Sequence, residues 1–132
     1  MTLVDTNVLL DVATDDSIWA DWSQRQLDAA AARGPVLIND VIYAELSAGF
    51  ARIEDLDEAL HEVGVGVEHT PRAGLFLAAK AHLRYRARGG TRTGVSPDLF
   101  IGAHAAVASL LLLTRDAARH RTHFPTVRLI CP

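Results

Sequence analysis

The chain has 132 residues, 49% hydrophobic and 22% charged, which excludes a disordered chain and favours one globular domain over residues 1–132. Its single cysteine, Cys131, excludes an internal disulfide framework and a cysteine-rich zinc site. No apolar run is long enough to cross a membrane and the N-terminal residues do not resemble a signal peptide, so we expect a cytoplasmic protein with no membrane partner.

The net charge of −3 conceals two halves of opposite sign. Residues 1–70 hold 3 basic and 14 acidic side chains, whereas residues 71–132 hold 10 basic and 2 acidic ones. This division fits a cluster of acids for a metal beside a basic surface for a polyanion. Solvated helix faces would give the same division, so charge alone leaves both interpretations open.

Helical and extended patterns alternate along the chain. Residues 2–5 form a short apolar run typical of a buried strand, and Thr6 is expected to cap a helix over residues 7–13. Gly34-Pro35 ends the second helix, and Ser96-Pro97-Asp98 has the capping residues of a helix start. The later predicted helices cover residues 17–33, 40–50, 53–63, 71–88, 96–109 and 115–123, and the later strands cover residues 35–39, 64–69, 110–113 and 127–130. Asp40 and Thr114 are expected to cap the third and the last of the predicted helices. Strands separated by helices predict an α/β fold with a parallel sheet covered on both faces.

Four acidic residues occupy informative places in this pattern: Asp5 ends the first strand, Glu45 lies in an apolar helix, Asp98 begins a helix and Asp116 follows the fourth strand. In parallel sheets, ligands bind at the carboxyl ends of the strands. If the first and fourth strands are neighbours, the four acids can therefore face one crevice. Their mutual repulsion then requires protonation or a cation, and hard oxygen ligands select Mg²⁺ or Mn²⁺. Taken singly, each acid could instead be a capping or solvated residue.

Around these acids the sequence resembles the PIN-domain family, and within it the VapC toxins of bacterial type II toxin–antitoxin pairs. The matching segments are VDTNVLLD at residues 4–11, VIYAEL at 41–46, SPDLFIGAHA at 96–105 and LLTRD at 112–116. Each segment alone is a weak signal, but the four in this order and spacing are strong evidence.

The resemblance implies a three-layer α/β/α domain with a central, mostly parallel sheet, and a Mg²⁺- or Mn²⁺-dependent endoribonuclease that inhibits growth or translation. It implies that Asp5, Glu45, Asp98 and Asp116 are the catalytic and metal-binding acids. The polar residues Thr6, Asn7 and Thr114 would orient them through hydrogen bonds. The implied partners are an RNA substrate, a cognate VapB-type antitoxin and a second copy of the chain in a homodimer.

Basic and histidine side chains offer further candidates. Arg92, Arg115 and Arg119 are candidate RNA-binding residues, with Arg115 favoured because it adjoins Asp116. His104 is expected to be a partly buried, hydrogen-bonded histidine, because it does not share a helix face with Asp98. The pair His120 and His123 is expected to be solvated.

Other functions fit the sequence less well. A phosphoaspartyl phosphatase of the HAD type needs a second acid two residues after the nucleophile, where this chain has Asn7. A receiver domain needs a lysine near the last strand, but the only lysine is Lys80, in a predicted helix. A catalytically silent PIN-like module that binds RNA or protein stays open as the alternative, although four intact acids argue against it.

Overall fold

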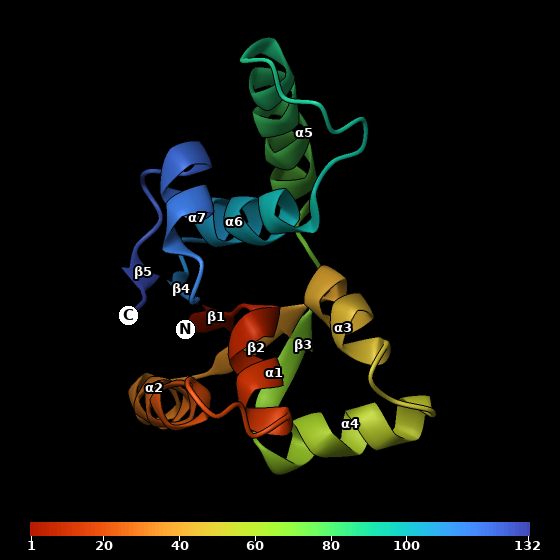
Figure 1. Cartoon of the computed structure of the whole chain (residues 1–132), viewed down its shortest axis with the longest axis vertical. Coiled ribbons are helices and arrows are strands. Elements are labelled where there is room, and N and C mark those ends of the chain that lie inside the picture. Colours follow the sequence, from red (N-terminus) through yellow and green to blue (C-terminus); the bar gives the residue numbers. More distant parts are fainter.

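The computed structural model describes all 132 residues and forms a five-stranded sheet between two layers of helices (Figure 1). The strands are β1 (Thr2–Val4), β2 (Val36–Asn39), β3 (Val65–Glu68), β4 (Leu111–Leu113) and β5 (Leu129–Ile130). The helices are α1 (Thr6–Ala13), α2 (Ala20–Arg33), α3 (Asp40–Ser47), α4 (Ile53–Glu62), α5 (Arg72–Ala87), α6 (Pro97–Ala108) and α7 (Ala117–His123). Every predicted strand and helix is present, in the predicted order.

All five strands are parallel, in the spatial order β3-β2-β1-β4-β5. The chain adds β2 and β3 on one side of β1 and then crosses to add β4 and β5 on the other. The order therefore reverses between β1 and β4, which pair directly, Val4 opposite Leu113. In sheets of this kind the crevice at the reversal point, outside the carboxyl ends of the strands, is the usual ligand site.

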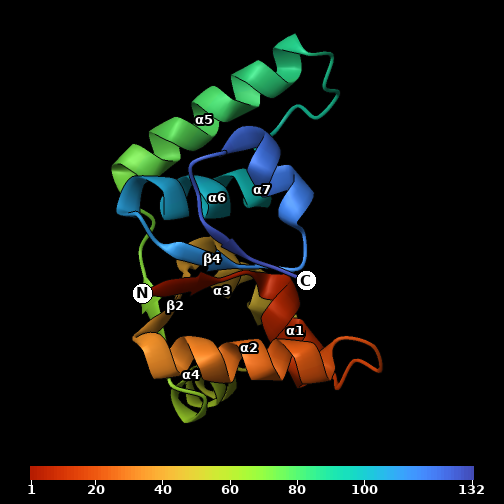
Figure 2. The same cartoon turned by 90° about the vertical axis from the view of Figure 1, so that its left-hand side faces the viewer.

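The helices form two separate layers (Figure 2). Helices α6 and α7 cover one face of the sheet, with α5 packed on the outer side of α6, and α1, α2 and α4 cover the other face. Helix α3 contacts both α1 and α6 and so joins the layers beside the sheet. This arrangement confirms the three-layer α/β/α architecture, with a sheet that is parallel throughout.

The position of the strands in the core explains why their sequences are continuous apolar runs. Leu3, Val4, Leu112 and Leu113 are fully buried in the two central strands, because helices cover both faces of the sheet. A second, smaller cluster lies between α5, α6 and α7, where the residues are mostly small: Ala78, Ala81, Leu99, Ala103 and Phe124. Small side chains there let the three helices pack closely.

Three helix caps differ from the prediction. The N-cap of α1 is Asp5, the N-cap of α3 is Asn39, and α7 begins after Asp116. Thr6, Asp40 and Thr114 were expected to cap these helices, but each side chain bonds a distant segment, and of the three only the Thr114 hydroxyl also accepts a local N–H, that of Asp116. Tertiary hydrogen bonds therefore decide which of two neighbouring polar residues caps the helix.

Candidate active site

Asp5 lies at the centre of the candidate site, where β1 ends and α1 begins. Its side chain is buried, and one carboxylate oxygen, Oδ1, accepts the backbone N–H of Thr6 at 2.8 Å. The other oxygen, Oδ2, accepts the Thr114 hydroxyl at 2.7 Å, and Asn7 Nδ2 lies 3.5 Å from it. Thr114 follows β4, so these bonds connect the two strands across the reversal point. Asn7 and Thr114 are therefore placed where they can orient the Asp5 carboxylate.

Glu45 reaches the same region from α3. Its Oε1 accepts the hydroxyl of Thr6 at 2.7 Å, while the backbone N–H of Thr6 is bound to Asp5. One residue, Thr6, thus binds two acids, its neighbour Asp5 and Glu45, which lies 39 residues after Thr6. The threonine at this position was predicted to cap α1, but its hydroxyl fixes Glu45 instead.

Asp98 and Asp116 meet through a shared arginine. Asp98 lies in the first turn of α6 and Asp116 at the start of α7. Arg119 forms an ion pair with Asp98 through Nη1, and its Nε lies 3.4 Å from Asp116 Oδ2. The hydrogen bond to Asp98, followed by the charges of Asp98 and Asp116, raises the pKa of the Arg119 guanidinium. The backbone N–H of Asp116 donates to the Thr114 hydroxyl at 3.0 Å, which connects this pair to Asp5.

The four acids therefore belong to one hydrogen-bonded network at the carboxyl edge of the sheet. Each is joined to the next through a single residue: Glu45 to Asp5 through Thr6, Asp5 to Asp116 through Thr114, and Asp116 to Asp98 through Arg119. The sequence predicted a convergence of the four acids if β1 and β4 were neighbours. The two strands do pair, but the acids are linked through intervening residues and their carboxylates are not gathered at one point.

The donor set suits a hard divalent cation. All four side chains offer carboxylate oxygens, and one oxygen on each of Glu45, Asp98 and Asp116 makes no hydrogen bond or ion pair within the protein. With Arg119 between Asp98 and Asp116, however, no three potential ligands are gathered closely enough to hold an ion by themselves. The residues thus fit Mg²⁺ or Mn²⁺ in ligand type. Their spacing suits an ion that is bound by a few carboxylates and has water as its remaining ligands.

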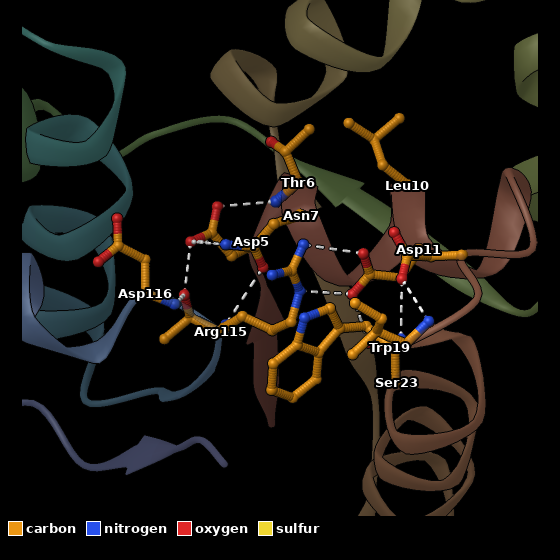
Figure 3. Close-up of polar contacts among 12 residues, drawn as sticks. Asp5, Thr6, Asn7, Leu10, Asp11, Trp19, Ser23, Arg115 and Asp116 are labelled. Carbon is orange, nitrogen blue, oxygen red and sulfur yellow. Dashed lines mark hydrogen bonds and ion pairs between the residues drawn. The ribbon is translucent and has the colours of Figure 1, made fainter.

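Arg115 supports the site from the side of α1 (Figure 3). Its guanidinium donates to both oxygens of Asp11, from Nε at 2.6 Å and from Nη2 at 2.9 Å, and it lies over the Trp19 ring. The Arg115 backbone N–H donates to Asn7 Oδ1 at 3.2 Å. This two-point attachment fixes the β4–α7 turn, and with it Thr114 and Asp116, against α1.

Asp11 is the functional-site neighbour that sequence reasoning missed. It is 3% exposed, and it also accepts the Ser23 hydroxyl of α2 at 2.7 Å. Asp11 ends the apolar run VLLD and lies four residues after Asn7, so both share one face of α1. The sequence signal that could have identified Asp11 is an acidic residue on the apolar face of a short helix, because a buried acid needs a partner.

The candidate RNA-binding arginines occupy different settings. The Nε and Nη2 atoms of Arg115 are bound to Asp11, so most of this side chain serves the fold. Arg119 is about three-fifths exposed and lies among the acids. Arg92 is exposed in the loop after α5 and makes no ion pair. Of the three, Arg92 and Arg119 are therefore the side chains with donors available to a ligand.

Of the two buried histidines, one has the environment that the sequence predicted and the other does not. His104 is 1% exposed and its Nδ1 lies 3.2 Å from Asn39 Nδ2, as expected of a hydrogen-bonded core histidine; burial lowers its pKa. His120 was expected to be solvated, but that prediction is wrong. It is 2% exposed, and its Nε2 lies 3.4 Å from Asp5 Oδ2, because α7 turns inward over the site.

Gly102 makes the inward placement of α7 possible. A Cβ at this position of α6 would overlap the Phe124 ring and would lie 3.0 Å from His120 Nδ1. The absence of a side chain at Gly102 lets these two buried groups lie against α6.

A Gly102→Ala variant is therefore expected to lose about 1–3 kcal/mol of unfolding free energy, because the extra carbon overpacks the contact between α6 and α7. Urea denaturation measures the loss. Gly94→Ala is the matched control, since a Cβ there meets nothing within 4 Å. Equal stability of the two variants would show that α7 can move away at no cost.

Comparison with known proteins decides the family. A model of the PIN domain matches residues 2–124. The chain belongs to the PIN domain family. No curated protein matches the sequence. None of the helices of this PIN domain combines the length and hydropathy needed to cross a bilayer.

Solved structures with the same fold come from several bacteria. VapBC2 from Rickettsia felis, bound to a DNA fragment from its promoter, contains a chain with a TM-score of 0.76 and 18% identity, covering 99% of this PIN domain and 98% of that chain. VapBC-1 from nontypeable Haemophilus influenzae gives 0.72 and 15%, with 98% and 96% covered. A toxin–antitoxin complex from Klebsiella pneumoniae gives 0.64 and 18%, with 96% and 95% covered. At these identities the likeness establishes the fold.

Proposed function

We propose that this PIN domain is a Mg²⁺- or Mn²⁺-dependent endoribonuclease of the VapC type, the toxin of a VapBC-type pair that acts in the cytoplasm and inhibits growth or translation. The observation that carries the proposal is the single network joining Asp5, Glu45, Asp98 and Asp116 at the reversal point of the sheet. Arg119 offsets part of this negative charge at Asp98 and Asp116, and a bound cation would offset the repulsion that remains among the four acids.

The four acids are the proposed ligands and catalytic groups. Asp5, Asp98 and Asp116 would hold the ion, directly or through water, and Glu45 would be a further ligand or would orient the attacking water. A bound divalent ion would lower the pKa of water and neutralise charge on the phosphate.

The surrounding residues perform the positioning. Thr114 and the backbone N–H of Thr6 fix both oxygens of Asp5, so its carboxylate has one orientation before any ligand arrives. The Thr6 hydroxyl holds Glu45 toward the same edge. Arg119 is an exposed cation beside Asp98 and Asp116 and is suited to a phosphate oxygen of the RNA.

The proposal predicts an absolute requirement for a divalent ion. Wild-type protein freed of metal with EDTA is expected to leave RNA intact, and added Mg²⁺ or Mn²⁺ is expected to restore cleavage by at least about 100-fold, because the ion supplies both the nucleophile and the charge neutralisation. Mapping the RNA ends checks the reaction, which should give 5′-phosphate and 3′-hydroxyl ends. Cleavage that persists in EDTA, or ends of the opposite kind, would contradict the proposal. Binding of RNA without cleavage under any ion would favour the silent RNA-binding module.

The proposed partners are a VapB-type antitoxin and a second copy of the chain in a homodimer. Support comes from the similar chains in VapBC and toxin–antitoxin complexes, which match this chain over nearly its whole length. Expression with and without the open reading frame adjacent to its gene tests the first partner. Growth arrest by the chain alone, relieved by the neighbouring product, is the expected result. Sedimentation of the purified chain tests the second.

A further inference from the structure

A cavity of about 230 Å³ opens next to the acid network, between α5, α6, α7 and the loop that joins α5 to α6. It shares Asp98 and Arg119 with the network. Its other walls are largely aromatic, from His82, Tyr85, His123 and Phe124, with Arg92 and Ser96 contributed by the loop. None of the roles assigned above to the acids accounts for this cavity.

The aromatic rings are close together but not stacked on one another. The ring centroid of Tyr85 lies 6.0 Å from that of His82, with an interplanar angle of 33°, and 6.5 Å from that of His123, with an angle of 71°. His123 and Phe124 are 6.3 Å apart and tilted by 56°. At these separations and angles the rings do not stack face to face on one another, so their faces can stack on a planar ligand.

The cavity is formed in advance of any ligand. The Tyr85 hydroxyl accepts the backbone N–H groups of Thr91 at 3.2 Å and Arg92 at 3.4 Å, which ties the loop to α5. Arg86 donates to the backbone carbonyls of the same two residues. Gly90 packs so closely on the Tyr85 ring that a Cβ would overlap it. A pocket held in this way loses little conformational freedom when it is filled.

The polar groups at the cavity are available to a ligand. Ser96 occupies the N-cap position of α6, yet its hydroxyl makes no capping hydrogen bond. Arg92 makes no ion pair, and Arg119 is exposed although it pairs with Asp98 and Asp116. Besides the Asp98 carboxylate, the walls thus combine aromatic faces, a hydroxyl and two guanidinium groups. Aromatic faces bind bases and guanidinium groups bind phosphates, so together they match a single-stranded nucleotide.

We infer that this cavity binds one unpaired base of a single-stranded RNA, the base adjoining the phosphate at the acid network. The inference rests on the proposed function, since it takes RNA as the substrate. Burial, followed by the charges of Arg88 and Arg84, lowers the pKa of His123. The lowered pKa favours the neutral ring, which stacks on a base without adding charge.

Fluorescence anisotropy with the full chain tests the inference. The probes are fluorescein-labelled RNA octamers of A, C, G or U, in EDTA so that no cleavage occurs. His123→Ala is expected to raise the Kd of the tightest octamer by about 5- to 100-fold, as the loss of one base stack does. His123→Phe keeps a ring and is expected to stay within about twofold of wild type. His61→Ala, the same change on an exposed histidine of α4, is the matched control and should leave Kd unchanged.

An abasic octamer separates stacking from phosphate binding. Wild type and His123→Ala should bind it with equal Kd, because the difference between them arises from the base. His82→Ala gives a second measurement on the same wall if His123→Ala does not fold. An unchanged Kd in the folded alanine variant, or no binding of any octamer by wild type, would overturn the inference.

The outcomes also distinguish this inference from the proposed function. Wild type that cleaves RNA with Mn²⁺ while His123→Ala binds and cleaves equally well would reject the base pocket and keep the nuclease. Octamer binding that depends on His123, in a protein that never cleaves RNA, would keep the pocket and reject the nuclease. A DNA octamer bound as tightly as RNA would overturn the assignment of RNA as the ligand.

Discussion

An Asp5→Asn protein is expected to fold and to lose metal-dependent RNA cleavage by more than about 100-fold. Substitution of groups that merely orient a metal ligand costs 10- to 100-fold in activity or metal affinity, and loss of a ligand's charge should exceed that. Asparagine nearly preserves the volume, and its carbonyl oxygen can still accept the Thr6 backbone N–H or the Thr114 hydroxyl. Cleavage rates with Mn²⁺, together with a Mn²⁺ titration followed by calorimetry, measure the effect.

The matched control is Asp21→Asn, the same change on an exposed aspartate of α2. It should leave both cleavage and Mn²⁺ binding unchanged. Wild-type cleavage by a correctly folded Asp5→Asn protein would remove Asp5 from the metal site. It would also leave the network at the reversal point without its central member.

Arg115→Ala is expected to lower the unfolding free energy by about 3 kcal/mol. The substitution leaves the Asp11 carboxylate buried with only the Ser23 hydroxyl as a partner, and removing one member of a buried ion pair typically costs 3–5 kcal/mol. We place the value at the lower end because the Arg115 side chain is 28% exposed, so water can partly replace it. Urea denaturation of the full chain measures the change.

Arg52→Ala provides the comparison for that measurement. Arg52 also pairs with an acid, Glu54, but both side chains are about two-thirds exposed. A surface pair of this kind contributes at most about 1 kcal/mol. Equal losses for the two variants would show that the Asp11–Arg115 pair does not hold α1 against the β4–α7 turn. Replacing Asp11 and Arg115 together by alanine should recover part of the loss, because no charge is then left unpaired.

The Arg115 result also bears on RNA binding. The sequence favoured Arg115 among the candidate phosphate ligands, because it adjoins Asp116. In the fold, two of its nitrogens are bound to Asp11, and its planar group rests on Trp19. Because Arg115 follows Thr114 and precedes Asp116, the sequence correctly placed it beside the acids. Its actual partners, however, come from α1 and α2, which lie about a hundred residues earlier in the sequence.

The sequence by itself determined the order of strands and helices, the parallel sheet and the four candidate acids. Apolar runs and alternating periods are local properties, and short-range patterns such as Gly34-Pro35 and Ser96-Pro97 mark element boundaries in one dimension. The four matching segments identified the family for the same reason, since each is a continuous stretch of chain.

Only the tertiary structure decided which residues from different strands and helices contact one another. Whether Thr6 caps α1 or holds Glu45, and whether His120 is solvated or lies against Asp5, depends on segments distant in the sequence. The same holds for the cavity beside Asp98, whose walls come from α5, α6, α7 and a loop. A polar side chain takes whichever partner packing brings within reach, because an unpaired buried group is costly, and no local pattern encodes that choice.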